Sequence, residues 1–173
     1  MPRPSIELLL LRHAKSSWAD EAMADHDRPL NARGIAAASR MGHLCRELGR
    51  IPDRILTSDA CRTRETVAGL TEASGFEGST TTTRTLYLAS PESILETVHE
   101  LGGDARRLLV VAHNPGMEAL MTRLASTPIH CPTATLSVFQ IPDSTTTWTD
   151  WSGEDATHLG TWRPKELPPP AAD

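Results

Sequence analysis

The feature that most constrains the fold is an unbroken apolar run, Leu8 to Leu11, which ends in Arg12 and His13. Such a run predicts a strand that is buried on both faces, as in a parallel sheet. A second run, Leu108 to Ala112, has the same character and ends in His113. Open α/β sheets bind their ligands at the carboxyl ends of parallel strands. The two histidines therefore mark a candidate site at one edge of the predicted sheet.

Length and composition are typical of one soluble globular domain. The 173 residues are 39% hydrophobic and 23% charged, so a full core can be buried without disulfides or metals. We expect one domain over residues 1–173, with about 168–173 as a flexible proline-alanine tail. The net charge of -5 implies no basic face, which argues against nucleic acid or an anionic membrane as a partner.

The cysteines indicate a reducing compartment. There are three, Cys45, Cys61 and Cys131, an odd number with no paired spacing. We expect reduced thiols and a cytoplasmic protein. No apolar run approaches the roughly 20 residues that span a bilayer. No cluster of metal-ligating residues is evident, so we expect neither a metal nor another cofactor.

Periodic patterns predict strands that alternate with helices. Helices are expected at about 32–49, 59–73, 91–101 and 117–124, and further strands at 54–57 and 80–86. In the first helix, Asn31 is the expected cap and Ile35 begins the apolar face. From Thr133 the pattern alternates, with Leu136, Val138 and Ile141 on one face, and it continues over 148–151 and 158–163. The prediction is a three-layer αβα sandwich with one mixed, mostly parallel central sheet and a C-terminal antiparallel meander.

A third polar segment completes the candidate site. Arg62 lies in the first turn of the helix that follows the strand at 54–57, and helix starts after parallel strands lie at the same sheet edge. Arg12 and Arg62 offer planar forks that hold phosphate oxygens. A neutral histidine is a competent nucleophile, and a protonated His113 would add positive charge. We therefore expect metal-independent phosphoryl transfer through a phosphohistidine intermediate on His13.

Several ordered motifs resemble one family. The segment 11–18, Leu-Arg-His-Ala-Lys-Ser-Ser-Trp, resembles the Arg-His-Gly signature of the histidine phosphatase (phosphoglycerate mutase-like) superfamily in its SixA-type form. Segments 27–34, 58–66 and 111–115 resemble the later blocks, and 160–167 resembles the ending. The resemblance covers about 5–167.

The resemblance implies roles for individual residues. His13 would be the nucleophile, and Arg12, Arg62 and His113 would bind the transferring phosphoryl group. Ser16 and Asn114 would contribute to substrate binding, although a serine after a strand is often only a turn residue. The implied activity is that of a phosphoric monoester or phosphoramidate hydrolase.

Two positions depart from the family pattern. Ala19 stands where many phosphoester-cleaving relatives carry asparagine, and Glu92 is the only carboxylate where they carry a general acid. Glu92 equally suits a helix start, where the dipole favours a negative charge. A missing acid favours phosphohistidine as the substrate, because an imidazole leaves phosphorus more readily than an alkoxide does.

Three functions therefore stay open. The leading prediction is dephosphorylation of protein phosphohistidine. One alternative is a small-molecule phosphomonoesterase that uses Glu92 as its proton donor. Another is a non-catalytic phosphate-binding module. Outside the site, we expect Asp25 to Asp27 to structure their loop and Trp18 to pack beneath it.

Overall fold

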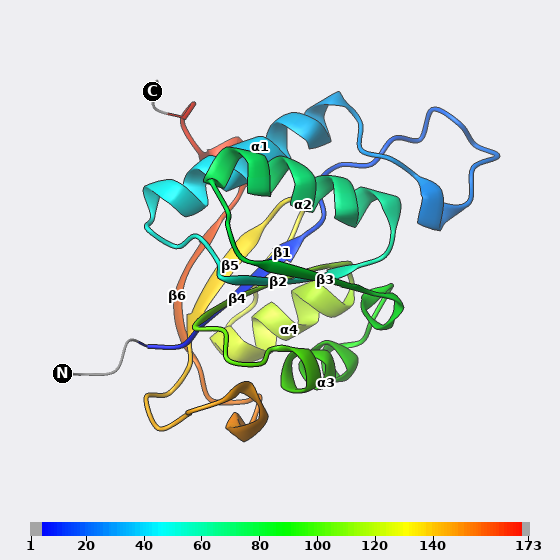
Figure 1. Cartoon of the computed structure of the whole chain (residues 1–173). Coiled ribbons are helices and arrows are strands. Elements are labelled where there is room, and N and C mark those ends of the chain that lie inside the picture. Colours follow the sequence, from blue (N-terminus) through cyan, green and yellow to red (C-terminus); the bar gives the residue numbers. More distant parts are fainter. Residues whose placement is uncertain (1–4, 171–173) are drawn as a thin grey trace.

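One mixed sheet organises the chain. Within residues 5–170, which the computed structural model describes, six strands lie in the order β3-β2-β4-β1-β5-β6 (Figure 1). The strands are β1 (Glu7–Arg12), β2 (Arg54–Ser58), β3 (Ser79–Thr83), β4 (Arg107–Ala112), β5 (Leu136–Gln140) and β6 (Thr157–Trp162). The first four are mutually parallel. β5 pairs antiparallel with β1 on one side and with β6 on the other. The predicted mixed, mostly parallel sheet is confirmed.

Helices cover both faces of the sheet. In the described part of the chain the α-helices are α1 (Ala32–Glu47), α2 (Cys61–Ser74), α3 (Pro91–Leu101) and α4 (Gly116–Ala125). Figure 1 shows α1 and α2 on one face and α3 and α4 on the other, which is the predicted three-layer sandwich. None of the helices within residues 5–170 combines the length and apolarity needed to cross a bilayer.

The leucines of β1 divide between two cores. Leu8 and Leu10 pack into the cluster beneath α3 and α4, and Leu9 and Leu11 into the cluster beneath α1 and α2. All four are fully buried. Each contributes about 2 kcal/mol by leaving water. The strand is therefore fixed from both sides, and the residues that follow it have a defined position.

The start of α1 fastens the loop that follows β1. The Asn31 side chain accepts a hydrogen bond from the Gly34 amide at 2.9 Å, as expected for the cap. The Asn31 amide donates to the Lys15 carbonyl, and a Cβ on Gly34 would lie only 2.1 Å from that oxygen. Only glycine therefore allows the helix to approach the end of β1 so closely.

Three local expectations are wrong. Ile35 is 59% exposed, because the buried stripe of α1 runs through Gly34, Ala38 and Met41 and leaves position 35 outside it. The 148–150 segment is a 3-10 helix whose Trp148 indole donates to the Ala105 carbonyl, so the meander consists of β5 and β6. Ile141 joins the core beneath α3 and α4 instead of the face shared by Leu136 and Val138.

The chain termini lie partly outside the described residues. Of the predicted flexible tail, residues 171–173 fall outside them. The carbonyl of Pro168 accepts a hydrogen bond from Arg40 on α1 at 2.8 Å. The single-domain boundary at 1–173 stays a prediction.

Replacing the cap of α1 tests this anchoring. Asn31→Ala is expected to lower the free energy of unfolding by about 1 kcal/mol, because the Gly34 amide loses its acceptor. Asn31→Asp retains an acceptor oxygen and should stay within about 0.5 kcal/mol of the wild type. Urea denaturation measures both variants. Equal losses would show that the cap is not the source of the effect.

Candidate active site

Strand pairing brings the two predicted histidines together. β1 and β4 are parallel neighbours, with Arg12 opposite Ala112, so His13 and His113 follow at the same edge. Their ring centroids lie 5.1 Å apart. Both rings are buried and line a cavity of about 370 Å³ together with Arg12 and Arg62.

The ring of His13 is held in one tautomer. Its Nδ1–H donates to the Ala14 carbonyl at 2.7 Å, so Nε2 carries a lone pair. Nε2 lies 3.3 Å from the Nε of Arg62, which donates to it. Thr66 fixes the supporting backbone by accepting from the Ala14 amide at 3.0 Å. Burial, with Arg62 and Arg12 nearby, lowers the pKa of His13 to about 4.

His113 has the opposite tautomer. Its Nδ1 accepts from the Nη2 of Arg62 at 3.1 Å, and its Nε2–H donates to the Ser58 hydroxyl at 2.9 Å. Burial, His13 and Arg62 lower the pKa of His113 to about 3. The expectation of a protonated His113 is therefore wrong for the anion-free site, because a second positive charge is disfavoured beside a buried guanidinium.

The two arginines approach from different elements. Arg62 lies in the first turn of α2, after β2, and β2 is the neighbour of β4. Its side chain is only 4% exposed. Arg12 ends β1, and its Nη1 donates to the Cys131 carbonyl at 3.0 Å. The Nε of Arg12 is buried and has no hydrogen-bond partner in the structure, so it is an available donor.

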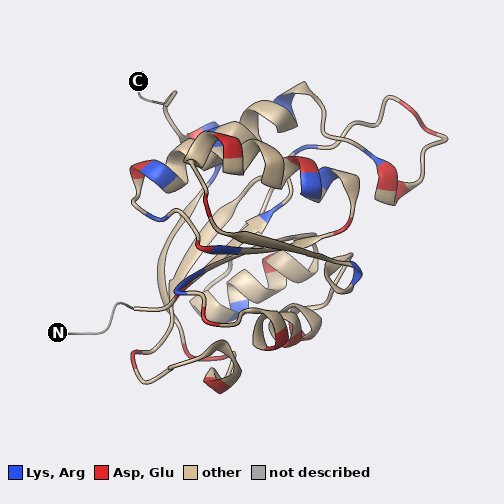
Figure 2. Cartoon of the chain, viewed as in Figure 1, with Lys and Arg blue, Asp and Glu red and all other residues tan. Residues whose placement is uncertain are grey.

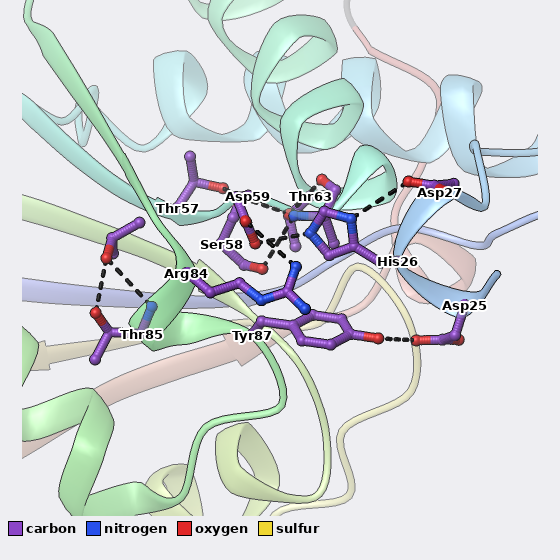
Figure 3. A network of polar contacts seen from close by, with 12 residues as sticks. Asp25, His26, Asp27, Thr57, Ser58, Asp59, Thr63, Arg84, Thr85 and Tyr87 are labelled. Atoms are coloured by element: carbon purple, nitrogen blue, oxygen red, sulfur yellow. Dashed lines mark hydrogen bonds and ion pairs between the residues drawn. The ribbon is translucent and has the colours of Figure 1, made fainter.

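A carboxylate that sequence reasoning did not place in the site pairs with Arg62. The Oδ2 of Asp25 accepts from the Nη2 of Arg62 at 3.0 Å. It also accepts from the Tyr87 hydroxyl at 2.6 Å (Figure 3). The backbone carbonyl of Asp25 accepts from the Nη1 of Arg62 at 2.6 Å. The hydrogen bond from Tyr87, together with that from Arg62, lowers the pKa of Asp25. These hydrogen bonds outweigh the effect of partial burial, which raises the pKa. Asp25 is therefore a carboxylate that lines the cavity.

Further contacts hold the Asp25 loop against the sheet edge. The Nε2 of His26 bonds Asp59 at 2.8 Å, and Arg84 reaches the same carboxylate (Figure 3). The Arg84 guanidinium lies 4.6 Å from the ring centroid of Tyr87. The loop segment Asp25 to Asp27 is structured as expected, but it also delivers Asp25 to the cavity. The only sequence signal for this role is the length of the polar loop after the first strand.

The comparisons with known proteins agree with this geometry. Residues 8–86 match the model of the histidine phosphatase superfamily (branch 1). The SixA structure from Agrobacterium tumefaciens is 31% identical, with a TM-score of 0.71 over 80% of this chain and 92% of that chain. The chain belongs to the histidine phosphatase superfamily. Membership supports phosphatase activity.

Two other similar proteins cover different shares of the chain. The SixA structure from Nakamurella multipartitia is 27% identical, with a TM-score of 0.79 over 95% of this chain and 99% of that one. An uncharacterized protein of Mycobacterium tuberculosis is 39% identical over 116 residues, which are 67% of this chain and 70% of the relative. This histidine phosphatase therefore shares its fold with SixA proteins along nearly its whole length.

The two predicted substrate-binding residues, Ser16 and Asn114, differ in availability. Ser16 is buried at the cavity, and its hydroxyl has no hydrogen-bond partner among the described residues. Asn114 also lines the cavity, but both ends of its amide are engaged. It donates to the Cys131 carbonyl at 2.9 Å and accepts from the Glu118 amide at 3.2 Å. Ser16 is thus the freer of the two predicted contacts.

Two other predicted positions are corrected. Glu92 is not among the residues that line the cavity; its side chain is 66% exposed and bonds Arg123 at 3.1 Å. Trp18 does not pack beneath its loop: it is 63% exposed, lines the cavity, and has Arg28 stacked 3.8 Å from its ring centroid. Among residues 5–170 there is no group of three or more His, Cys, Asp or Glu side chains placed to hold a metal ion.

The neutral histidines predict a coupling between anion binding and protonation. Sulfate keeps its charge near pH 5, so its binding is expected to raise the pKa of His113 and take up about one proton. Isothermal titration calorimetry in buffers of different ionisation enthalpy measures this uptake.

A matched variant identifies the group that is protonated. His113→Asn retains Arg12 and Arg62 and should still bind sulfate, but with most of the uptake lost. Heats of binding that do not depend on the buffer, or uptake that persists in His113→Asn, would contradict the assignment.

Proposed function

We propose that this phosphatase hydrolyses phosphohistidine in proteins, with His13 as the nucleophile. The observation that carries the proposal is the position of His13 Nε2. Nε2 accepts a hydrogen bond from Arg62 at the cavity, while the Ala14 carbonyl holds the opposite nitrogen. A neutral, oriented imidazole next to guanidinium groups is suited to attack a phosphoryl group whose charge those groups neutralise.

The reaction proceeds in two transfers. His13 Nε2 forms a bond to phosphorus while the bond from phosphorus to the substrate imidazole breaks, and the pair of electrons leaves with that imidazole. The new phosphohistidine carries positive charge on its ring, which the Ala14 carbonyl stabilises through Nδ1–H. Water then attacks phosphorus, the bond to Nε2 breaks, and inorganic phosphate and neutral His13 are released.

The environment of the cavity supports an imidazole as the leaving group. A substrate imidazole that is protonated on its far nitrogen departs as a neutral ring and needs no acid. The carboxylate nearest the reacting groups is Asp25, whose lowered pKa keeps it ionised. Glu92 bonds Arg123 away from the cavity. An alkoxide leaving group, as in a phosphomonoester, would find no protonated carboxyl group among the residues that line the cavity.

The proposal also covers compartment and partner. Cys45, Cys61 and Cys131 are unpaired, and burial raises the pKa of each thiol, which supports a cytoplasmic protein with structural cysteines. The partner is a protein that carries phosphohistidine. The chemistry of the cavity and the surface around it indicate this chemical class of partner.

Replacing the nucleophile is the direct test. His13→Ala should lower kcat on a phosphohistidine peptide about a thousandfold or more, because no covalent intermediate can form. Wild-type enzyme quenched during turnover should carry phosphate that survives alkali and is lost in acid. His43→Ala, which changes a histidine on α1 outside the cavity, is the matched control. Unchanged turnover by His13→Ala would refute the nucleophile, and tight phosphate binding without a labelled enzyme would instead indicate a binding module.

A pair of carboxylate variants separates phosphohistidine hydrolysis from ester hydrolysis. Glu92→Gln should change neither activity by more than about twofold, since its side chain bonds Arg123. Asp25→Asn keeps an acceptor for Arg62 and Tyr87, and should lower the two activities by the same factor. Steady-state rates on a phosphohistidine peptide and on an aryl phosphomonoester test both expectations. A loss confined to the ester in either variant would favour the small-molecule phosphomonoesterase.

A further inference from the structure

A second, larger cavity adjoins the catalytic cavity. This second cavity, the basic groove, has a volume of about 670 Å³, and the catalytic cavity has about 370 Å³. Arg12, Lys15 and Thr133 line both, so the two lie side by side. The far wall of the groove comes from the first turns of α1 and from the 3-10 helix Pro164–Glu166. A substrate held at His13 can therefore extend along the groove.

The groove concentrates positive charge in an acidic protein. Five basic side chains line it: Arg12, Lys15, Arg33, Arg163 and Lys165. Its only carboxylate is Glu166, which bonds Arg163. Lys15, Arg33 and Lys165 are exposed and have no hydrogen-bond or ion-pair partner among the described residues. Lys15 and Lys165 are also the two lysines of a chain whose net charge is -5.

Some of the acidic residues lie far from the groove. Figure 2 shows acidic residues gathered on α3, on the side of the sheet opposite α1. Clustered positive charges repel one another unless an anion lies between them. The unpaired cations of the groove therefore favour a ligand with negative charge beyond the phosphoryl group itself.

The walls of the groove are fixed by the fold. Arg163 donates to the His130 carbonyl from Nε at 3.0 Å and from Nη2 at 2.7 Å. Arg12 holds the next residue, Cys131, through its carbonyl and keeps a buried Nε without a partner. These bonds hold the 130–133 segment between the groove and the catalytic cavity. The groove is consequently formed before any ligand arrives.

The mouth of the catalytic cavity carries apolar side chains. Trp18 and Leu88 line this cavity and are 63% and 53% exposed. Trp18 is held by stacking on Arg28, whose own side chain is buried. Large exposed apolar side chains beside a polar site are typical of a surface that contacts another protein. A small phosphorylated metabolite would leave both side chains in water.

Taken with the proposed function, on which this inference rests, we propose that the basic groove binds an acidic segment of the phosphoprotein substrate. The phosphohistidine enters the catalytic cavity between Trp18 and Leu88. Asp or Glu residues that flank it in the chain then lie along Lys15, Arg33 and Lys165. The groove selects among phosphohistidine proteins, whereas the cavity performs the chemistry.

Two peptides and one small substrate test the proposal. The peptides carry the same central phosphohistidine, with acidic residues on both sides in one and glutamine at the same positions in the other. Phosphoimidazole reports the chemical step without the groove. Wild-type kcat/KM should favour the acidic peptide about tenfold at an ionic strength of about 0.1 M, and this preference should nearly vanish at about 1 M.

Charge reversal at the far wall of the groove should remove the preference. Arg33→Glu with Lys165→Glu should make the two peptides equal substrates, with the loss confined to kcat/KM for the acidic one. Phosphoimidazole hydrolysis should not change. Arg64→Glu, which reverses an exposed arginine in the first turns of α2 outside both cavities, is the control for charge reversal away from the groove and should retain the preference.

The outcomes distinguish this proposal from the proposed function. If the wild-type enzyme hydrolyses phosphoimidazole and hydrolyses the two peptides equally fast, the proposal for the groove is overturned. The catalytic assignment then stays intact. An equal loss on all three substrates in the double variant would also overturn it, because a structural defect would explain the loss. No hydrolysis of phosphoimidazole or peptides by wild type would refute the proposed function. If the double variant loses activity on a small bisphosphate but on no other substrate, the groove binds a second phosphate group instead.

Discussion

The guanidinium of Arg62 connects the two histidines of the cavity with its carboxylate. It donates to the Nε2 of His13, to the Nδ1 of His113, and to both the carboxylate and the carbonyl of Asp25. These partners come from the end of β1, the end of β4 and the long loop that precedes α1. No other described side chain bonds all three segments. Because the guanidinium is almost fully buried, each of these hydrogen bonds forms with little competition from water.

The same burial sets the protonation of the site. Removing the two imidazoles from water beside a permanent cation disfavours their charged forms, so both are neutral before a ligand binds. A neutral His13 is the form with a nucleophilic lone pair. Asp25 offsets the charge of Arg62 while the cavity lacks a phosphoryl group. An incoming phosphoryl group therefore competes with a carboxylate for the same guanidinium, which disfavours weakly charged ligands.

The sequence pattern was sufficient to predict the sheet edge and four of its side chains. Long apolar runs identify β1 and β4 because both strands are buried on both faces, and each run places a histidine at its end. Arg62 follows from the helix start after β2. Asp25 and Tyr87 were not predictable, because they reach the cavity through a loop and a 3-10 turn, which have no periodicity. Trp18 was misjudged for a related reason: stacking on Arg28 holds it in water, and composition alone favours burial.

The absence of an evident acid and the presence of a basic groove are linked in physical terms. A cavity that offers a nucleophile and cations, but no protonated carboxyl group, favours a leaving group that departs unaided. Such chemistry discriminates between kinds of phosphorus bond and not between proteins that carry the same bond. Discrimination among proteins must then come from contacts outside the reacting atoms, and affinity realised there is independent of the leaving group. The unpaired Lys15, Arg33 and Lys165 are placed for such contacts, in a groove that adjoins the cavity of His13.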